Sequence, residues 1–165
     1  MEQRINIYEK FPSAIKPFFA IGRYLAKSSL EKSLQQLVEF RVSQINGCAY
    51  CLDMHSKDLR AGGEKEQRLY LLTAWRESSS FFTDRERAAL EWTEAVTKLT
   101  DGQVTDEVYQ IARHEFSEQE LIDLTLAIIG TSCYNRLNIA FRIPPGSYQP
   151  GQFNNLFKEE TAASN

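Results

Sequence analysis

One stretch organises this chain, and it reads Ser43-Gln44-Ile45-Asn46-Gly47-Cys48-Ala49-Tyr50-Cys51-Leu52-Asp53-Met54-His55. It carries two of the three cysteines and one of the two histidines of the sequence. The Asn46-Gly47 pair interrupts one apolar-periodic segment and opens another, so we expect Cys48 in the first turn of a new helix. Cys48 and Cys51 are spaced i,i+3, and Cys51 and His55 are spaced i,i+4, which places all three on one helical face. The pattern therefore predicts two thiols and a titratable base at one site.

Composition limits the kind of protein this is. The chain has 165 residues, of which 42% are hydrophobic and 12% aromatic, so it can bury one substantial core as a single domain. Its net charge of -3 argues against nucleic acid as a partner. The first ten residues include charged side chains, and no apolar run reaches the roughly 18 residues needed to cross a bilayer. We expect a soluble cytoplasmic protein, where a close cysteine pair is typically redox-active or metal-binding.

The rest of the sequence predicts an all-α fold. Apolar residues recur at helical spacing over 11–27, with Pro17 as a kink or boundary, and again over 30–45, 48–61 and 64–75. Thr83 to Glu86 and Ser117 to Glu120 fit capping boxes that start two further helices, and Thr105 is expected to cap a short helix that ends at His114. We expect 121–141 to be a central helix, buried on nearly every side, that is ended by Pro144-Pro145-Gly146. No strand-like alternation is seen.

Thiol chemistry at this site depends on how the thiolate is favoured. A cysteine with a pKa of ~8.5 is mostly protonated at neutral pH, and only the thiolate attacks. The helix N-terminus favours negative charge on Cys48 most strongly, whereas His55 is placed to accept the proton of Cys51. The two influences favour different cysteines. A base within reach adds proton transfer to electrostatic stabilisation, which favours Cys51 as the attacking thiol.

Several separate runs resemble the AhpD-like alkylhydroperoxidase family, within the carboxymuconolactone decarboxylase superfamily. The runs are Arg41 to Asp58, Ala61 to Glu64, Ala74 to Glu77, Asn135 to Leu137 and Pro144 to Gly146. The likeness covers roughly residues 30–146, which we take as the core of a single domain spanning 1–165, with 147–165 as a C-terminal arm. The resemblance implies an all-helical homotrimer or hexamer with a peroxide-reducing dithiol. It also assigns peroxide attack to the second cysteine, Cys51.

The expected activity is thus a thiol-dependent peroxidase that needs no cofactor or metal. Cys51 would be oxidised to a sulfenic acid, His55 would serve as its acid and base, and Cys48 would then form a disulfide with it. An external dithiol, of the thioredoxin or lipoyl type, would reduce that disulfide. The Cβ atoms of an i,i+3 pair lie about 5 to 6 Å apart on an ideal helix, so the first turn would have to tighten. We expect both sulfurs to share a partly open cavity with His55.

One departure concerns the proton relay. The resemblance implies a glutamate twelve residues before the first cysteine, and that position holds Gln36, which cannot carry a proton. Glu39 lies three residues on, on nearly the same helical face, and is the candidate substitute. The alternative reading of Glu39 is a surface charge with no role.

Other functions fit parts of the pattern. The Cys-x-x-Cys-x-x-x-His array could supply three zinc ligands, although no second ligand pair is in sight. The decarboxylase branch of the superfamily is a second alternative, in which the cysteine pair has no evident use. A third is a non-catalytic redox sensor or interaction module. The remaining cysteine, Cys133, lies in the apolar 121–141 segment and is expected to be a core residue.

Overall fold

Every regular element between residues 2 and 153, the part of the chain that this computed structural model describes, is helical. The first half contains α1 (Ile7–Lys10), α2 (Pro12–Ile15), the 3-10 turn Lys16–Phe18, α3 (Phe19–Leu25), α4 (Lys32–Asn46), α5 (Ala49–Ala61) and α6 (Glu66–Leu71). The second half contains α7 (Asp84–Lys98), α8 (Asp106–Glu115) and α9 (Glu118–Phe141), with 3-10 turns at Leu72–Ala74, Ser79–Phe81 and Thr100–Gly102. The all-α prediction is confirmed. None of the described helices is long and apolar enough to span a bilayer.

The helix starts follow from capping side chains. The Thr83 and Ser117 hydroxyls accept the N3 amides of α7 and α9, while Glu86 and Glu120 reach back to the cap amides. Both predicted capping boxes are therefore present, and each satisfies two amides that have no partner within the helix. Thr105 caps α8 through one hydrogen bond, which its hydroxyl accepts from Val108 N.

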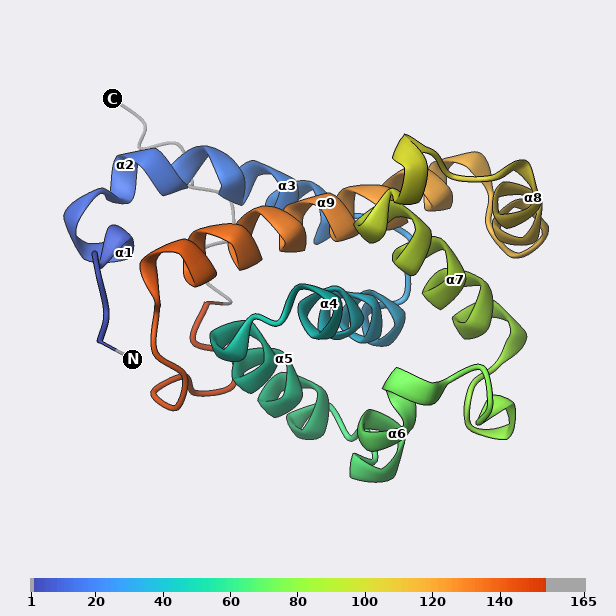
Figure 1. The fold of residues 1–165 in the computed structure, drawn as a ribbon, viewed down its shortest axis with the longest axis horizontal. Coiled ribbons are helices and arrows are strands. Elements are labelled where there is room, and N and C mark those ends of the chain that lie inside the picture. The colour runs from blue at the N-terminus through green and yellow to red at the C-terminus, as the bar shows by residue number, and fades with distance from the viewer. Residues whose placement is uncertain (1, 154–165) are drawn as a thin grey trace.

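The helices are arranged around α4. In Figure 1, α9 runs along one side of the molecule and α4 lies in the middle, with α5 below it and α7 beside it. α4 packs against α5, α7 and α9, and α3 packs on the other side of α9. One apolar cluster lies between α4, α7, α8 and α9, and a second lies among α4, α5, α6 and α7. Because α4 borders both clusters, its sequence fixes the position of α5 and hence of the cysteine pair.

Two predictions about α9 are wrong. The helix is not buried all round, because Ile122, Ile129 and Ile139 are 55%, 43% and 45% exposed. Cys133 is a free, half-buried cysteine rather than a core residue. The apolar side chains of α9 exceed what one chain can cover, and a composition that is apolar on every side does not reveal which side is left uncovered. The predicted last residue, Phe141, is confirmed, and Arg142 follows it in the left-handed conformation (φ 55°), before the prolines.

The two ends of the described chain pack against the helices. Pro17 lies in the 3-10 turn that separates α2 from α3, where the sequence predicts a kink or boundary. The short α1 was not predicted, and its segment is joined to the end of α9 by Arg4 N, which donates to Phe141 O at 3.0 Å. At the other end, Tyr148 is buried and its hydroxyl donates to the Asp58 carboxylate of α5. The rest of the predicted C-terminal arm, from residue 154, lies outside the described residues.

Candidate active site

The turn between α4 and α5 places Cys48 just outside α5. Gly47 ends α4 in the left-handed conformation (φ 70°), which a residue with a side chain adopts only with strain. Cys48 is the N-cap, with φ -83° and ψ 98°, and its sulfur accepts from Cys51 N at 3.3 Å. The prediction that Cys48 lies in the first helical turn is therefore corrected by one residue. The extended backbone lets a cysteine side chain take the capping position that serine and aspartate commonly occupy.

The sulfurs of Cys48 and Cys51 are joined in a disulfide across this helix start. The two Cα atoms are 5.3 Å apart, within the usual range for disulfides. From the sequence, we expect that the first helical turn would have to tighten for the two sulfurs to bond. In the structure, the non-helical backbone of Cys48 brings the two cysteines close enough instead.

The site is more enclosed than expected. Cys48 and Cys51 are each only 1% exposed and His55 is 8% exposed, so the prediction of a partly open cavity does not hold for this conformation of the chain. The enclosing layer is thin on one side, because Gly47 and Ala49, the neighbours of Cys48, are both exposed. The buried cysteine pair is thus flanked in the chain by exposed residues of the α4–α5 turn.

His55 lies one turn beyond Cys51 on α5 and faces Glu39 of α4. Glu39 Oε2 is 3.7 Å from His55 Nδ1, too long for a hydrogen bond, and Glu39 Oε1 accepts from Gln35 Nε2 at 2.9 Å. Burial lowers the pKa of His55 from 6.5 to about 4, so the imidazole is neutral at pH 7. Burial also raises the pKa of Glu39 from 4.5 to about 7. A neutral base beside a carboxyl that titrates near neutrality is an arrangement that suits proton transfer.

Gln36 and Glu39 reach different parts of α5. A methyl group added at Gly62 would lie 3.8 Å from Gln36 Oε1, so the Gln36 side chain lies toward the end of α5 away from the cysteines. Glu39 is the carboxylate that lies beside the imidazole, and its side chain is 18% exposed. This placement suits the predicted substitution of Glu39 for Gln36, whose catalytic role stays a prediction.

Two residues that the sequence did not reveal lie at the cysteine pair. Asn138 of α9 donates from Nδ2 to Cys51 Sγ at 3.3 Å, and Tyr8 of α1 donates to Asn138 Oδ1 at 2.8 Å. Asn138 is 4% exposed. One feature of the sequence could have indicated Asn138, namely an uncharged amide inside an apolar helix. Such a group needs a hydrogen-bond partner when it is buried.

A second amide of α9 fixes the α4–α5 turn. Asn135 is fully buried, donates to Ser43 Oγ at 3.1 Å and accepts from Asn46 Nδ2 at 3.0 Å. Ser43 in turn donates to Glu39 O. These contacts tie the residues that flank the cysteine pair to α9, so both buried amides of α9 serve the same turn.

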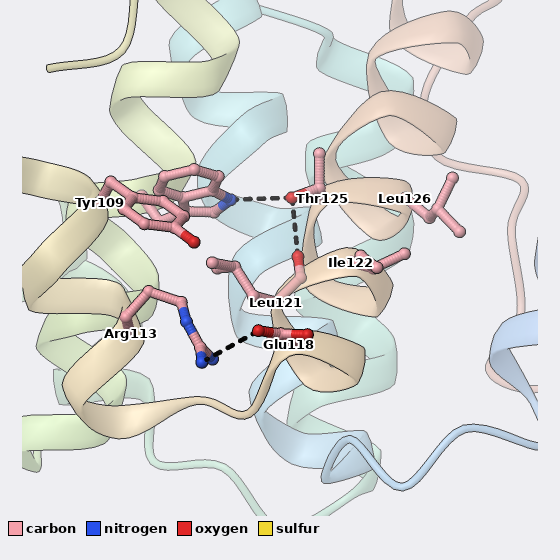
Figure 2. A pocket seen from close by; sticks show the side chains of 8 residues that line it. Tyr109, Arg113, Glu118, Leu121, Ile122, Thr125 and Leu126 are labelled. Carbon is pink, nitrogen blue, oxygen red and sulfur yellow. Dashed lines mark hydrogen bonds and ion pairs between the residues drawn. The ribbon is translucent and has the colours of Figure 1, made fainter. Parts of the chain in front are cut away.

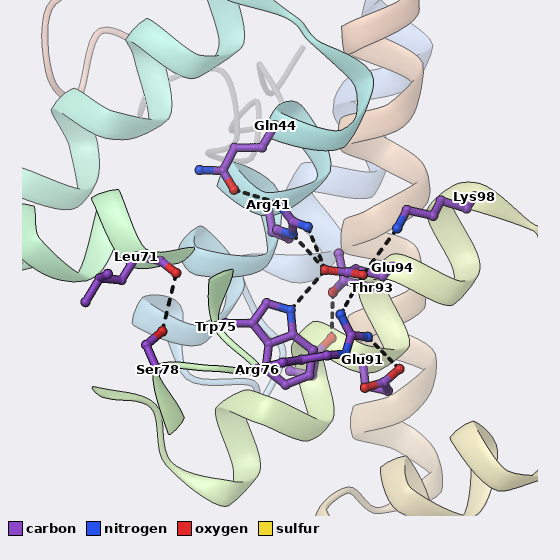
Figure 3. Close-up of polar contacts among 11 residues, drawn as sticks. Arg41, Gln44, Leu71, Trp75, Arg76, Ser78, Glu91, Thr93, Glu94 and Lys98 are labelled. Carbon is purple, nitrogen blue, oxygen red and sulfur yellow. Dashed lines mark hydrogen bonds and ion pairs between the residues drawn. The ribbon is translucent and has the colours of Figure 1, made fainter. Parts of the chain in front are cut away.

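A separate polar cluster lies on the α7 side of α4. Glu94 accepts from Arg41, Trp75 and Arg76 at 2.6 to 3.0 Å, and from Lys98 at 3.3 Å (Figure 3). Burial opposes ionisation of this carboxyl, but the hydrogen bonds from Trp75, Arg41 and Arg76 prevail and lower its pKa to about 2. Glu94 is therefore a permanent anion that holds α4, α7 and Trp75 together.

A mainly apolar pocket lies away from the predicted site residues. It measures about 400 Å³ and is lined by Trp92, Tyr109, Arg113, Glu118, Leu121, Ile122, Thr125 and Leu126 of α7, α8 and α9 (Figure 2). Trp92 donates to Thr125 Oγ1 at its wall. None of its lining groups is a cysteine or a neutral base, so it offers no thiol chemistry. Among residues 2–153, no group of three or more His, Cys, Asp or Glu side chains is arranged to hold a metal ion.

Comparison with known proteins places this site in a family. The sequence profile of the carboxymuconolactone decarboxylase family matches residues 12–95, which include both cysteines and His55. YdfG of Bacillus subtilis (strain 168) is 41% identical over 140 residues, which cover 85% of this chain and 95% of YdfG. YnjA of Escherichia coli (strain K12) is 31% identical over 72% of this chain and 64% of its own length.

Solved structures agree with this placement. An Agrobacterium tumefaciens protein, described as a candidate antioxidant defence protein AhpD, superposes with a TM-score of 0.84 and 37% identity over 89% of this chain and 100% of its own. A peroxidase-related protein of Ralstonia eutropha JMP134 with an AhpD core has a TM-score of 0.74 at 20% identity, over 91% of this chain and 76% of its own, which supports the fold alone. The chain therefore belongs to the carboxymuconolactone decarboxylase family and has the AhpD-like fold.

Proposed function

We propose that the protein is a thiol-dependent peroxidase that reduces an organic or hydrogen peroxide through Cys51 and Cys48. The observation that carries the proposal is the disulfide between these cysteines, one turn from a neutral imidazole that faces a carboxyl titrating near pH 7. The Agrobacterium tumefaciens relative, described as a candidate antioxidant defence protein AhpD, supports the same chemistry.

In the first step the Cys51 thiolate attacks one peroxide oxygen, and the O–O bond breaks. The sulfur gains a hydroxyl group as sulfenic acid, and the second oxygen leaves as an alkoxide or hydroxide that takes a proton. The proton comes from the thiol itself and passes through neutral His55. Because the pKa of Glu39 is about 7 and that of His55 about 4, the Glu39 carboxyl is the group that can hold this proton, once the 3.7 Å gap to the imidazole closes to hydrogen-bonding distance.

The second step closes the disulfide. The Cys48 thiol attacks the Cys51 sulfenic acid, the S–S bond forms, and the hydroxyl leaves with the thiol proton as water. A dithiol donor, of the thioredoxin or lipoyl type, then reduces the bond by two thiol–disulfide exchanges and is itself oxidised to a disulfide. Two electrons thus pass from the dithiol to the peroxide, and the protein needs no cofactor.

Both reactants must reach enclosed sulfurs. Gly47 and Ala49, on either side of Cys48, are exposed, so we propose that a shift of the α4–α5 turn opens the site. The setting that we propose is a cytoplasmic homotrimer or hexamer. The exposed isoleucines of α9 support assembly with further copies.

The test is to add cumene hydroperoxide to the reduced protein, count the thiols lost and map the new link by mass spectrometry. We expect two thiols lost per chain and a Cys48–Cys51 link. Cys51→Ser should abolish peroxide consumption, whereas Cys48→Ser should leave a sulfenic acid on Cys51 that dimedone traps. Activity retained by Cys51→Ser would overturn the assignment.

Two controls separate the alternative functions. Stopped-flow reduction of peroxide in the presence of a dithiol distinguishes an enzyme from a redox sensor, which oxidises once without rapid turnover. An assay with a carboxymuconolactone-type acid examines the decarboxylase alternative. Turnover of the lactone acid by Cys51→Ser would favour that alternative over the peroxidase.

A further inference from the structure

The peroxide-reacting sulfur has a side-chain partner that comes from the opposite end of the chain. Asn138 Nδ2 lies 3.3 Å from Cys51 Sγ, within hydrogen-bonding distance for sulfur. The two residues are 87 positions apart, and both are buried. Cys48 has a different partner, the backbone amide of Cys51. The fold therefore gives each sulfur its own donor, and only the donor to Cys51 is a side chain that substitution can remove.

The orientation of the Asn138 amide follows from its two neighbours. A disulfide sulfur carries no proton and can only accept, so the NH2 end of the amide faces Cys51. The carbonyl end faces Tyr8, whose hydroxyl donates to Oδ1 at 2.8 Å. Burial raises the pKa of Tyr8 to about 12, so its hydroxyl keeps its proton throughout the neutral range.

Tyr8 is held in place by the attachment of the N-terminal segment to the end of α9. Arg4 donates from its backbone amide to Phe141 O and from Nη1 to Ala140 O, both at 3.0 Å. Ile7 is buried, and Asn6 caps α1 through Glu9 N. The segment that supplies Tyr8 thus binds the same helix end that carries Asn138.

We propose that Asn138 is a catalytic residue that stabilises the Cys51 thiolate by hydrogen bonding, and that Tyr8 is a positioning residue that orients the Asn138 amide. A donor to sulfur binds a thiolate more strongly than a neutral thiol, so it favours ionisation of Cys51. This contribution differs from that of His55, because it stabilises the charge that remains after the proton has left. This role of Asn138 extends the proposed peroxidase function. Its use in catalysis rests on that function, whereas its effect on the ionisation of Cys51 does not.

The other groups around Cys51 are the same in Asn138→Ala and in the protein it is compared with. Tyr50 precedes Cys51 in the chain, His55 shares its helix, and Glu39 faces His55 from α4. The N-cap position 48 holds serine in every protein compared. Substituting Asn138 removes an uncharged donor and adds no charge. A change in thiolate formation therefore reports the lost hydrogen bond.

The experiment measures thiolate absorbance near 240 nm against pH in the reduced Cys48→Ser/Cys133→Ser protein, where Cys51 is the remaining thiol. We expect Asn138→Ala to raise the Cys51 thiol pKa by about one unit, which is about tenfold less thiolate at pH 7. Tyr8→Phe should move it in the same direction by a smaller amount. The matched control is Tyr24→Phe, since Tyr24 also donates from the N-terminal part to a polar residue of α9, Asp123, at 2.9 Å.

An unchanged titration in Asn138→Ala, or an equal shift in Tyr24→Phe, overturns the proposal. Loss of stability in Asn138→Ala without a shift also overturns it, because a purely structural residue would behave that way. Should Asn138→Ala fail to fold, Tyr8→Phe decides by the same titration. The titration uses no peroxide, so it still tests the role of Asn138 if the protein proves not to be a peroxidase. An unchanged titration, in turn, would not contradict the proposed peroxidase activity.

Discussion

Glu94 of α7 and Glu39 of α4 have opposite chemistry because their surroundings differ. Glu94 accepts from two arginines, a lysine and a tryptophan, and its pKa falls to about 2. Glu39 accepts from one amide, has a half-buried side chain that lies beside a neutral imidazole, and its pKa rises to about 7. The first carboxylate is fixed as an anion and can only hold helices together. The second gains and loses a proton near neutral pH, as a relay requires.

The strongest expected effect is on the Glu94 side. Glu94→Ala leaves the buried Arg41 guanidinium without its carboxylate partner, and breaking a buried pair in this way typically costs about 3 to 5 kcal/mol of unfolding free energy. Urea denaturation measures the loss. Glu91→Ala is the matched control on the same helix, because it removes only the half-exposed pair with Arg76 and should cost less than about 1 kcal/mol. Equal losses of unfolding free energy in the two variants would show that the buried pair of Glu94 with Arg41 contributes no more to stability than the exposed pair of Glu91 with Arg76.

The next effect is on rate rather than stability. Glu39→Gln removes the carboxyl that faces His55 and should reduce kcat/KM for cumene hydroperoxide at pH 7 by about 10² or less, the lower end for acid–base groups. Glu31→Gln makes the same chemical change at the exposed start of α4 and should leave the rate unchanged. If Glu39→Gln reduces peroxide as fast as the unmodified chain, Glu39 has no relay role and the Gln36 position is a real loss.

The two carboxyls also give opposite pH dependences of stability. The folded pKa of Glu39 lies above its unfolded value, so its stabilising contribution is complete below pH 4.5 and is lost as pH rises through about 7. For Glu94 the folded pKa lies below the unfolded value, so its contribution is present above pH 4.5 and is lost as pH falls through about 2. The folded pKa of His55 also lies below its unfolded value. Its contribution to stability is therefore present above pH 6.5 and is lost as pH falls through about 4.

Glu39→Gln should therefore make the protein more stable at pH 8 by up to about 3 kcal/mol, the free-energy equivalent of moving a pKa from 4.5 to about 7. At pH 4.5 the two proteins should differ little, because Glu39 is then protonated in the folded state. Urea midpoints at the two pH values give the comparison. A variant that is no more stable at pH 8 would mean that Glu39 is solvated in solution and ionises normally.

Features that depend on neighbouring residues could be predicted from the sequence, whereas contacts between distant residues could not. Short-range rules describe the helix caps at Thr83 and Ser117 well. They also describe the placement on one helical face of Cys48, Cys51 and His55, which lie within two turns of each other. Cys48 was misplaced by one residue because the left-handed Gly47 delays the start of α5. Glu39 could be proposed from a three-residue offset along one helix.

Contacts between distant residues were out of reach. Tyr8 and Asn138 are 130 positions apart, and no pattern in either segment points to the other. The exposure of Cys133 and of the α9 isoleucines was missed for a related reason. An evenly apolar helix carries no periodic signal that shows which face its neighbours leave open.

The smallest effect concerns the position that the family resemblance assigns to the relay. Gln36→Glu restores a carboxyl there, but the side-chain oxygen of Gln36 lies near Gly62, about two turns beyond His55 on α5. We expect kcat/KM to change by about twofold at most, the influence of a unit charge about 10 Å away in water-like surroundings. Stopped-flow peroxide reduction of the single variant, and of Gln36→Glu combined with Glu39→Gln, measures it. A double variant as fast as the unmodified chain would move the relay to position 36, and the contrast between the two glutamates would then describe burial alone and not function.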